Sequence, residues 1–291
     1  MKILNFGSIN IDHVYNLSRF VQPGETLCSD NYQTFIGGKG CNQSVALAKS
    51  GAKVYHAGCI GNDGLWIRDQ LNYWGANTDF IKVTEEATGH AIIQVNESGE
   101  NAIILHGGAN ENISSSQIDK TLRHFGKGDL LLLQNEINNI ANIIGKASAK
   151  GMTIFFNPAP MSNEVLQYPL DKVNLFIVNN IEGKDLTNQT DPKMVLEVMA
   201  QKFPFAGTLL TLGKDGAIYV KGKDTFVVKA LEVQAVDTTA AGDTFIGYFL
   251  GGWMDELKIS DSLRLAAKAA ALSVTRKGGA VSIPNKEEVE R

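Results

Sequence analysis

Four short, mostly apolar runs lie in the middle of the chain, and helical patterns separate them. The runs are Leu130–Leu133, Ile154–Phe156, Leu175–Val178 and Leu209–Leu212. Runs of this length without alternation are typical of strands buried on both faces of a parallel sheet. Ile137–Ala149 and Met194–Phe203 have helical spacing, and they stop near Gly151 and Pro204. Strand and helix therefore alternate, which predicts βαβ units in a doubly wound, mainly parallel α/β sheet.

A second type of pattern predicts a small separate sheet. His90–Val95 and Asn101–Leu105 are extended runs joined by Asn96–Glu100, whose Gly99 is a hairpin signal. Together with segments near 12–17 and 31–36, they predict a lid that stands off the main layer and excludes water from a site. We interpret the chain as one domain, residues 1–291, with lid segments near 12–17, 31–36 and 89–106.

The composition excludes several classes of function. Apolar residues make up 44% and charged residues 20%, so a sizeable core is expected, and the net charge of -4 without a Lys/Arg run argues against a nucleic-acid or anionic-membrane partner. The three cysteines lack CxxC spacing and the five histidines lack an HExxH pattern, which argues against a zinc site. No apolar run approaches about 18 residues and no secretory signal is visible, so we expect a cytoplasmic protein without a membrane span.

The stretch Asp237–Phe245 reads Asp-Thr-Thr-Ala-Ala-Gly-Asp-Thr-Phe and precedes an apolar run. Thr238 or Thr239 can cap a helix that starts here. The amides expected to point outward without a partner are those of Ala240, Ala241 and Gly242. Such amides bind an anion, and the adjacent Asp243 suits a base that takes a proton from a group attacking that anion. The stretch therefore predicts phosphoryl transfer to an alcohol.

A glycine-rich stretch, Ile36–Asn42, reads Ile-Gly-Gly-Lys-Gly-Cys-Asn and leads into a helical pattern. Its glycines suggest close approach of the backbone to a ligand, although turn chemistry explains them equally well. The P-loop pattern does not fit, which argues against a Walker-type nucleotide site. The Rossmann fingerprint is also missing, which disfavours a dehydrogenase. Asn10 and Asp12 can project the same way from an early strand toward sugar hydroxyls, but taken alone they fit an ordinary turn at least as well.

Polar residues also follow the predicted strands of the main sheet. Glu136, Asn157, Asn179 and Glu182 lie at or just beyond the ends of three of them. In open α/β sheets, ligands bind outside the carboxyl ends of the strands, so these side chains are candidates for one site. For any single residue, a turn is an equally good explanation.

Together, the Gly-Gly-Lys-Gly and Ala-Ala-Gly-Asp motifs resemble the two signatures of the ribokinase-like carbohydrate kinase family. The resemblance runs from Gly7–Asn10 to Val274–Gly278 and includes Asn157–Pro160 and Asn179–Glu182. It implies a kinase that transfers the γ-phosphate of ATP to a primary hydroxyl of a small sugar, with ribose as the expected acceptor. The alternatives are a kinase of the same fold for deoxyribose, a ketohexose or a nucleoside and, more remotely, a catalytically silent sugar-binding protein.

The resemblance also implies the roles of individual residues. Asp243 would be the base, and the Ala240, Ala241 and Gly242 amides would stabilise the transferred phosphoryl group. The residues implied in sugar binding are Asn10, Asp12, Gly38, Lys39, Asn42, Glu136 and Asp243. Those implied at ATP and Mg²⁺ are Asn179, Glu182, Thr211, Gly213, Gly216 and Gly242. Those implied around K⁺ are Asp237, Thr239, Ser273, Arg276, Gly278 and Ser282.

Two further expectations concern the surroundings of the site. The resemblance implies a homodimer formed through the lid. We expect lid residues such as His90, Ile92 and Gln94 to shape the sugar pocket. In the family an Asn or His often contacts adenine at the position that is Ala267 here.

Overall fold

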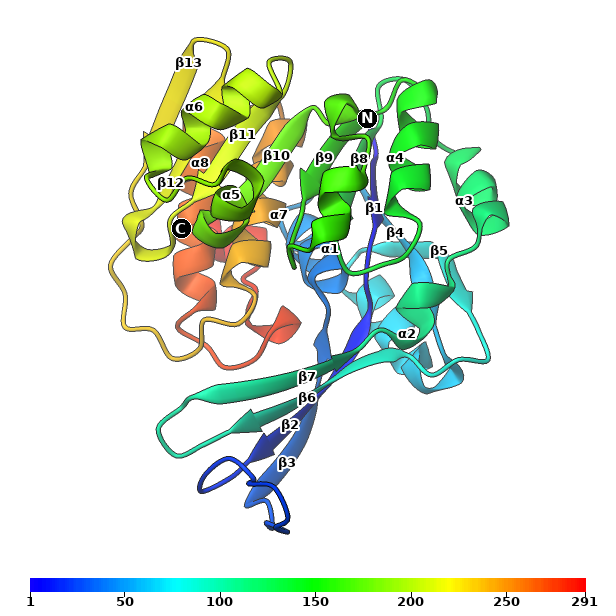
Figure 1. Ribbon diagram of the computed structural model, residues 1–291, viewed down its shortest axis with the longest axis vertical. Helices are drawn as coiled ribbons and strands as arrows, with labels where there is room; N and C mark the ends of the chain where they lie inside the picture. The colour runs from blue at the N-terminus through cyan, green and yellow to red at the C-terminus, as the bar shows by residue number, and fades with distance from the viewer.

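A nine-stranded sheet with the order β13-β12-β11-β10-β9-β8-β1-β4-β5 forms the centre of the molecule (Figure 1). The computed structural model describes residues 1–291. The strands are β1 (Ile3–Phe6), β4 (Val54–Ile60), β5 (Asn77–Val83), β8 (Leu130–Gln134), β9 (Thr153–Asn157), β10 (Leu175–Asn179), β11 (Gly207–Thr211), β12 (Ala217–Lys221) and β13 (Asp224–Val228). Neighbouring strands from β11 to β5 are parallel, and only β12 runs in the opposite direction, antiparallel to both β11 and β13. This confirms the predicted mainly parallel sheet.

Helices cover both faces of this sheet. They are α1 (Lys39–Lys49), α2 (Leu65–Tyr73), α3 (Ser115–Leu122), α4 (Ile140–Ala149), α5 (Asn180–Thr187), α6 (Pro192–Lys202), α7 (Ala241–Met254), α8 (Ile259–Ser273) and α9 (Lys286–Glu290). No helix combines the length and apolar character needed to cross a bilayer. The alternation of helix and strand is the one that the sequence predicts.

The apolar runs are buried on both sides because their side chains alternate between two cores. In β8, Leu130 and Leu132 pack with α1, α7 and α8, whereas Leu131 and Leu133 pack with α3, α4 and α6. A strand with one wet face would need polar residues at alternate positions. The continuous run Leu130–Leu133 therefore specifies a strand between two helical layers.

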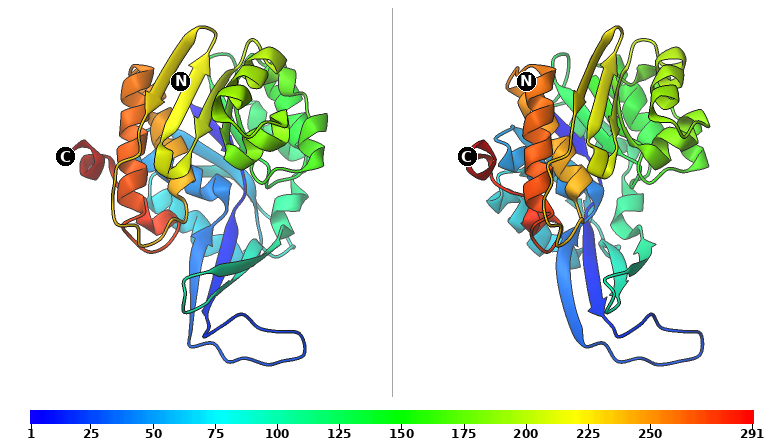
Figure 2. Two further views of the ribbon diagram at one scale, coloured as in Figure 1. Left: turned by 60° about the vertical axis from the view of Figure 1, so that its left-hand side comes forward. Right: turned by 90° about the vertical axis from the view of Figure 1, so that its left-hand side faces the viewer.

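A four-stranded sheet stands off the main layer, as both views in Figure 2 show. Its strands, in the order β3-β2-β6-β7, are β2 (Asn10–Asn16), β3 (Asn31–Gly37), β6 (Gly89–Val95) and β7 (Asn101–His106). We call this sheet the lid. Strand β2 follows β1 after only Gly7–Ile9, and β3 leads directly into α1, so the lid is joined to the core next to the predicted site. The structure confirms the predicted lid and its hairpin.

Helices α1 and α7 lie close together because small residues face each other between them. A Cβ atom on Gly247 would overlap Ala46, and one on Gly251 would overlap the side chain of Ser50. Glycine at these positions allows the two backbones to approach. The packing brings the amino-terminal end of α7, with Asp243, next to the amino-terminal end of α1, with Asn42.

Candidate active site

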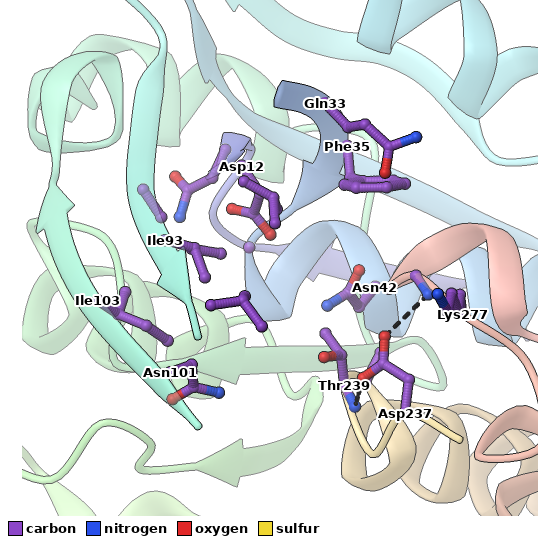
Figure 3. A pocket seen from close by; sticks show the side chains of 18 of the residues that line it. Asp12, Gln33, Phe35, Asn42, Ile93, Asn101, Ile103, Asp237, Thr239 and Lys277 are labelled. Atoms are coloured by element: carbon purple, nitrogen blue, oxygen red, sulfur yellow. Dashed lines mark hydrogen bonds between the residues drawn. The ribbon is translucent and has the colours of Figure 1, made fainter. Parts of the chain in front are cut away.

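A cavity of about 700 Å³ lies between the lid and the amino-terminal ends of α1 and α7. Figure 3 shows Asp12 and Ile93 on its lid side and Asp237 and Thr239 across from them. Every residue that the sequence predicts for sugar binding lines this cavity: Asn10, Asp12, Gly38, Lys39, Asn42, Glu136 and Asp243. The structure thus brings together residues from the lid, α1, α7 and the end of β8.

The lid face that lines the cavity differs from the expected one. His90, Ile92 and Gln94 do not line it; Ala91 and Ile93 do. Side chains alternate between the two faces of a strand, so the expectation was displaced by one residue. Within β6 the face that lines the cavity is apolar, with Ala91, Ile93 and Val95, whereas the opposite face carries the polar His90 and Gln94.

Two partly buried carboxyl groups, those of Asp12 and Glu136, lie at one end of the cavity. Burial, with a smaller contribution from the charge of Glu136, raises the pKa of Asp12 to about 7. Burial also raises the pKa of Glu136, although the nearby Lys39 ammonium opposes this. Glu136 Oε2 accepts hydrogen bonds from Ser8 Oγ at 2.5 Å and from the Lys39 amide at 2.8 Å. These bonds fix Glu136 between the turn after β1 and the start of α1.

Asn10 is held by Asn110, a residue that sequence reasoning missed. Asn10 Oδ1 accepts a hydrogen bond from Asn110 Nδ2 at 2.8 Å, and Asn110 Oδ1 accepts one from the Ile9 amide at 3.0 Å. Asn10 Nδ2 has no hydrogen-bond partner within the chain, so its two donors remain for a ligand.

Helix α7 begins in a way that the sequence did not predict. Its first flanking residue, Ala240, has a left-handed backbone with φ of 60°, and no side chain caps the helix. Neither Thr238 nor Thr239 is the cap, because Ala240 is the flanking residue and neither hydroxyl accepts a bond from the first amides of the helix. The Thr239 amide donates to Asp237 Oδ1. The missing cap leaves amides at the helix start for an external anion.

The free amides at this helix start differ by one from those expected. The Ala241 amide donates to the Thr238 carbonyl at 3.2 Å, so it is not unpaired. The amides of Ala240, Gly242 and Asp243 have no acceptor within the chain. Three donors therefore remain, and Asp243 contributes both one of them and a carboxylate. Such a helix start suits an anion that receives a nucleophile beside it.

The Asp243 carboxylate is buried and held by two consecutive residues of α1. Oδ2 accepts a hydrogen bond from Asn42 Nδ2 at 3.0 Å, and Oδ1 accepts one from Gln43 Nε2 at 2.9 Å. The charge of Asp243 is the main cause that raises the pKa of Lys39 above its usual value. Lys39 therefore stays a cation near Asp243.

Two further cavities continue from the first around the start of α7. One of about 230 Å³ shares Lys39, Ala240 and Asp243 with the cavity of about 700 Å³, which we call the sugar cavity after the residues predicted to bind sugar. The other, of about 360 Å³, lies between β11, α7 and α8 and shares Thr211 and Gly242 with the second. The predicted nucleotide residues line these two cavities: Asn179, Glu182, Thr211, Gly213, Gly216 and Gly242. The free amides of α7 thus lie between two larger spaces.

The NxxE segment is a capping box at the start of α5. Asn179 Oδ1 accepts hydrogen bonds from the amides of Ile181 and Glu182, and Glu182 Oε2 accepts one from the Asn179 amide at 2.6 Å. Burial raises the pKa of Glu182, although the amide bond and the Lys39 charge oppose this. Glu182 Oε1 has no hydrogen-bond partner within the chain, and Glu182 lines the cavity of about 230 Å³.

The predicted cation residues fall into two groups. Asp237 accepts hydrogen bonds from the amides of Thr239 and Gly278, both at 2.9 Å, and so ties two loops together. The Ser273 and Ser282 hydroxyls donate to the carbonyls of nearby residues, and Arg276 pairs with Glu288. The side chains of these three residues are therefore engaged in bonds within the chain. The structure contains no cluster of three or more His, Cys, Asp or Glu residues suited to a metal.

Residues 1–286 match the model of a family described as pfkB family carbohydrate kinase. The chain belongs to this family. A ribokinase from Haemophilus influenzae is 37% identical over 295 residues, which cover 97% of this chain and 95% of that protein. A deoxyribokinase from Salmonella typhi is 32% identical over 99% of this chain and 97% of its own. The structure of Arabidopsis thaliana ribokinase with ribose and ATP superposes with a TM-score of 0.87 at 29% identity, covering 99% and 97% of the two chains.

Membership of the pfkB family confirms the predicted kinase class and fold. In this carbohydrate kinase the predicted sugar residues line one cavity and the predicted nucleotide residues line the next two. Sequence reasoning missed Ser8, Gln43 and Asn110, which hold Glu136, Asp243 and Asn10. Their partners are far away in the sequence, so no local pattern could have identified them.

Proposed function

We propose that this pfkB-family kinase transfers the γ-phosphate of ATP to a primary hydroxyl of a small sugar, and that the sugar is ribose. The position of Asp243 carries the proposal, since it lines the sugar cavity and also lies beside the free amides of α7. The ribokinases related to this chain, one of them solved with ribose and ATP, favour ribose as the acceptor. The deoxyribokinase relative makes deoxyribose the first alternative.

The polar groups around the cavity suit a molecule with several hydroxyls. Asp12 and Glu136 offer acceptors, and Asn10 Nδ2 offers donors. Asn42 Oδ1 is buried without any hydrogen-bond partner. A buried acceptor of this kind calls for a donor from a ligand, and a sugar hydroxyl supplies one. We therefore assign these four side chains to orienting the sugar, with its reactive hydroxyl toward Asp243.

The reaction needs position and charge stabilisation more than covalent chemistry. Asp243 accepts the proton of the attacking hydroxyl as the bond to phosphorus forms and the bond to the leaving diphosphate breaks. The amides of Ala240, Gly242 and Asp243 donate to the oxygens of the phosphoryl group in flight. Lys39 adds a positive charge between the two substrates, because it lines both the sugar cavity and the next one.

Mg²⁺ fits the second cavity. Glu182 Oε1 is the carboxylate oxygen left free by the capping box, and carboxylate oxygens and waters are the ligands that Mg²⁺ prefers. When bound, Mg²⁺ neutralises charge on the nucleotide phosphates. Glu182 would hold it through Oε1 or a bound water, while Asn179 keeps Glu182 in place through the cap.

K⁺ fits the two loops joined by Asp237. Burial acts to raise the pKa of Asp237, but hydrogen bonds from Thr239 and Gly278 and the charge of Lys277 outweigh it and lower the pKa, so the carboxylate stays ionised. An ionised carboxylate among backbone carbonyls is a set of hard oxygen ligands. Bound there, K⁺ would supply a fixed charge. Asp237 itself holds the Thr239 amide just before the start of α7.

A homodimer through the lid is supported by its exposed apolar residues. Strand β7 is an edge strand with no buried residue, and Ile104 and Leu105 are 63% and 51% exposed. Ile92 on the neighbouring strand β6 and Tyr32 on β3, the opposite edge strand of the lid, are also exposed. An apolar edge of this kind favours a partner surface. Size-exclusion chromatography with light scattering tests the dimer; a monomer at micromolar concentration would contradict it.

A substrate panel tests the proposed reaction. ADP release is measured with ATP and, in turn, ribose, 2-deoxyribose, a ketohexose and a nucleoside, in K⁺ or Na⁺ buffers with Mg²⁺. We expect the highest kcat/KM with ribose, a phosphorus NMR signal of a primary phosphate ester, and faster turnover in K⁺. A higher kcat/KM with another acceptor would replace ribose, and ADP release with none of them would reject the kinase proposal.

A further inference from the structure

A line of buried side-chain hydrogen bonds leads from Asp243 into the core. Gln43 Nε2 donates to Asp243 Oδ1, and Gln43 Oε1 accepts from Gln134 Nε2 at 2.6 Å. Gln134 Nε2 also donates to Asn5 Oδ1 at 3.0 Å. Gln43 and Asn5 are fully buried and Gln134 is 1% exposed. Buried amides carry a large penalty unless they are paired, so their orientation matters.

The inner end of this line is neutral. Asn5 Nδ2 donates to Ser44 Oγ at 2.8 Å, and Ser44 Oγ lies 2.7 Å from Nδ1 of the buried His56. Burial lowers the pKa of His56 to about 4, so the imidazole carries no charge at neutral pH. Asp243 is therefore the only charged member of the line.

Backbone carbonyls fix which way each amide points. Asn5 Nδ2 donates to the Gly40 carbonyl at 2.7 Å, and a carbonyl only accepts. Asn5 Oδ1 must then face Gln134 and accept from its Nε2, and Gln134 Nε2 in turn faces Gln43 Oε1. This leaves Gln43 Nε2 to face Asp243. The orientation thus follows from the covalent polarity of the backbone and not from a choice between the two ends of an amide.

A second carbonyl fixes Gln43 independently. Asn157 Nδ2 donates to the Ile177 carbonyl at 2.9 Å, so Asn157 Oδ1 faces Gln43 and accepts from its Nε2 at 3.2 Å. If Gln43 were reversed, its Oε1 would lie against both Asn157 Oδ1 and the Asp243 carboxylate. Two separate contacts therefore oppose that reversal.

Gln43 lines none of the three cavities, in contrast to its neighbour Asn42, which lines the sugar cavity. We propose that Gln43 is the positioning residue of the base: with Asn42 on the other oxygen it fixes the plane of the Asp243 carboxylate, and Gln134 holds Gln43 in place. This inference rests on the proposed role of Asp243. Gln43 acts through Asp243 alone and does not touch the sugar or ATP.

The test separates turnover from binding. In Gln43→Leu we expect kcat to fall by about 10- to 100-fold, because a displaced base misses its near-attack geometry. Sugar Kd from isothermal titration should stay within about twofold, because the four side chains assigned to orienting the sugar are unchanged. Gln43→Glu, which keeps the volume but replaces the donor with a carboxylate, should lose at least as much kcat. Wild-type kcat in folded Gln43→Leu, or an equal loss of sugar binding, would overturn the proposal.

Gln117→Leu is the matched control, because Gln117 is also a buried glutamine. Its Nε2 donates to the Gly58 carbonyl at 2.8 Å and its Oε1 accepts from Cys59, away from Asp243. Its substitution should lower thermal stability by a similar amount and leave kcat unchanged. An equal loss of kcat in Gln117→Leu would mean that Gln43 acts through stability only.

A double variant tests the connection to Gln134. Gln134→Leu should lower kcat as well, and Gln43→Leu with Gln134→Leu should lose no more than Gln43→Leu alone, since both act through one bond to Asp243. Additive losses would contradict the connection, and Gln134→Leu also serves if Gln43→Leu does not fold. The Asp243→Asn variant distinguishes failure of the proposed base from failure of the positioning role. If it keeps turnover, the proposed base is wrong; if it is inactive while Gln43→Leu is normal, only the positioning role fails.

Discussion

Gly37 at the end of β3 lies directly against the carboxyl group of Asp12. A Cβ atom at position 37 would overlap all three carboxyl atoms, so any side chain there displaces Asp12. The two residues lie close to each other on paired strands, β2 and β3. The first glycine of the Gly-Gly-Lys-Gly motif therefore leaves space for the Asp12 carboxyl group, which we propose binds the sugar.

We expect Gly37→Ala to raise the sugar Kd by about 10- to 100-fold, the cost of losing a hydrogen bond to a charged group. The kcat at saturating sugar should fall less, because Asp243 is untouched. Gly126→Ala is the control, since a Cβ at Gly126 meets no atom within 4 Å. Unchanged sugar affinity in Gly37→Ala would show that Asp12 does not contact the sugar.

Sugar affinity should depend on pH around neutrality. The pKa of Asp12 is raised to about 7, so the carboxyl is mostly neutral below this pH and mostly ionised above it. The ionised form is the better acceptor of two hydroxyls. The sugar Kd should therefore rise about tenfold from pH 8 to pH 6. Titration calorimetry without nucleotide measures it, and Asp12→Asn should bind weakly with no such slope. A wild-type Kd that does not change over this range would show that the ionisation of Asp12 does not affect sugar binding.

The Asp243→Asn variant should bind sugar almost normally and lose turnover. The amide keeps the shape of the side chain but cannot accept a proton, and a general base contributes on the order of 10²- to 10⁴-fold. Isothermal titration beside an ADP-release assay separates the two effects. Near wild-type turnover would remove Asp243 as the base.

We expect the protein to discriminate only weakly between the bases of nucleotide substrates. The cavity of about 360 Å³ beside α8 is lined mainly by alanines and other apolar residues, among them Ala267, Ala270 and Ala271, and its only polar side chains are Thr211, Lys214 and Thr238. Apolar pockets discriminate poorly between ligands of similar shape. We expect GTP to support turnover with kcat/KM within about tenfold of ATP. A kcat/KM with GTP that is several orders of magnitude lower would contradict this prediction and would mean that backbone groups discriminate between the two bases.

Ala267→Asn provides the counterpart to this prediction. It places a donor and an acceptor at the helix face toward the cavity and should widen the gap between ATP and GTP. Sugar affinity, measured without nucleotide, should not change, because Ala267 does not line the sugar cavity.

The sequence was sufficient for those parts of the site that lie within one short segment. The runs now seen as β8 to β11 and the pairing of Asn10 with Asp12 on one strand face follow from local periodicity. The start of α7 was partly mispredicted, because the left-handed backbone of Ala240, a residue with a Cβ, has no signal in local propensity. As a result, the prediction of a Thr cap and the prediction of a free Ala241 amide were wrong.

Other features depend on contacts that no local pattern contains. The lid face was displaced by one residue, because the alternation in β6 separates a face with His90 and Gln94 from a face with Ala91 and Ile93 but does not say which of the two points into the cavity. Gln43, Gln134 and Asn5 come from α1, β8 and the core of β1, and only the folded sheet brings them to Asp243. The resemblance to the family reached the residues proposed to contact substrates but not those that hold these residues in place.

The attachment of the lid has a thermodynamic consequence. Strand β2 carries Asp12, and β3 ends at Gly37 immediately before Gly38 and Lys39, so the lid strands are themselves part of the sugar cavity. A displacement of the lid therefore moves the sugar ligands with it. By thermodynamic reciprocity, if a partner that binds the outer face of the lid changes the sugar affinity by some factor, the sugar changes the affinity for that partner by the same factor.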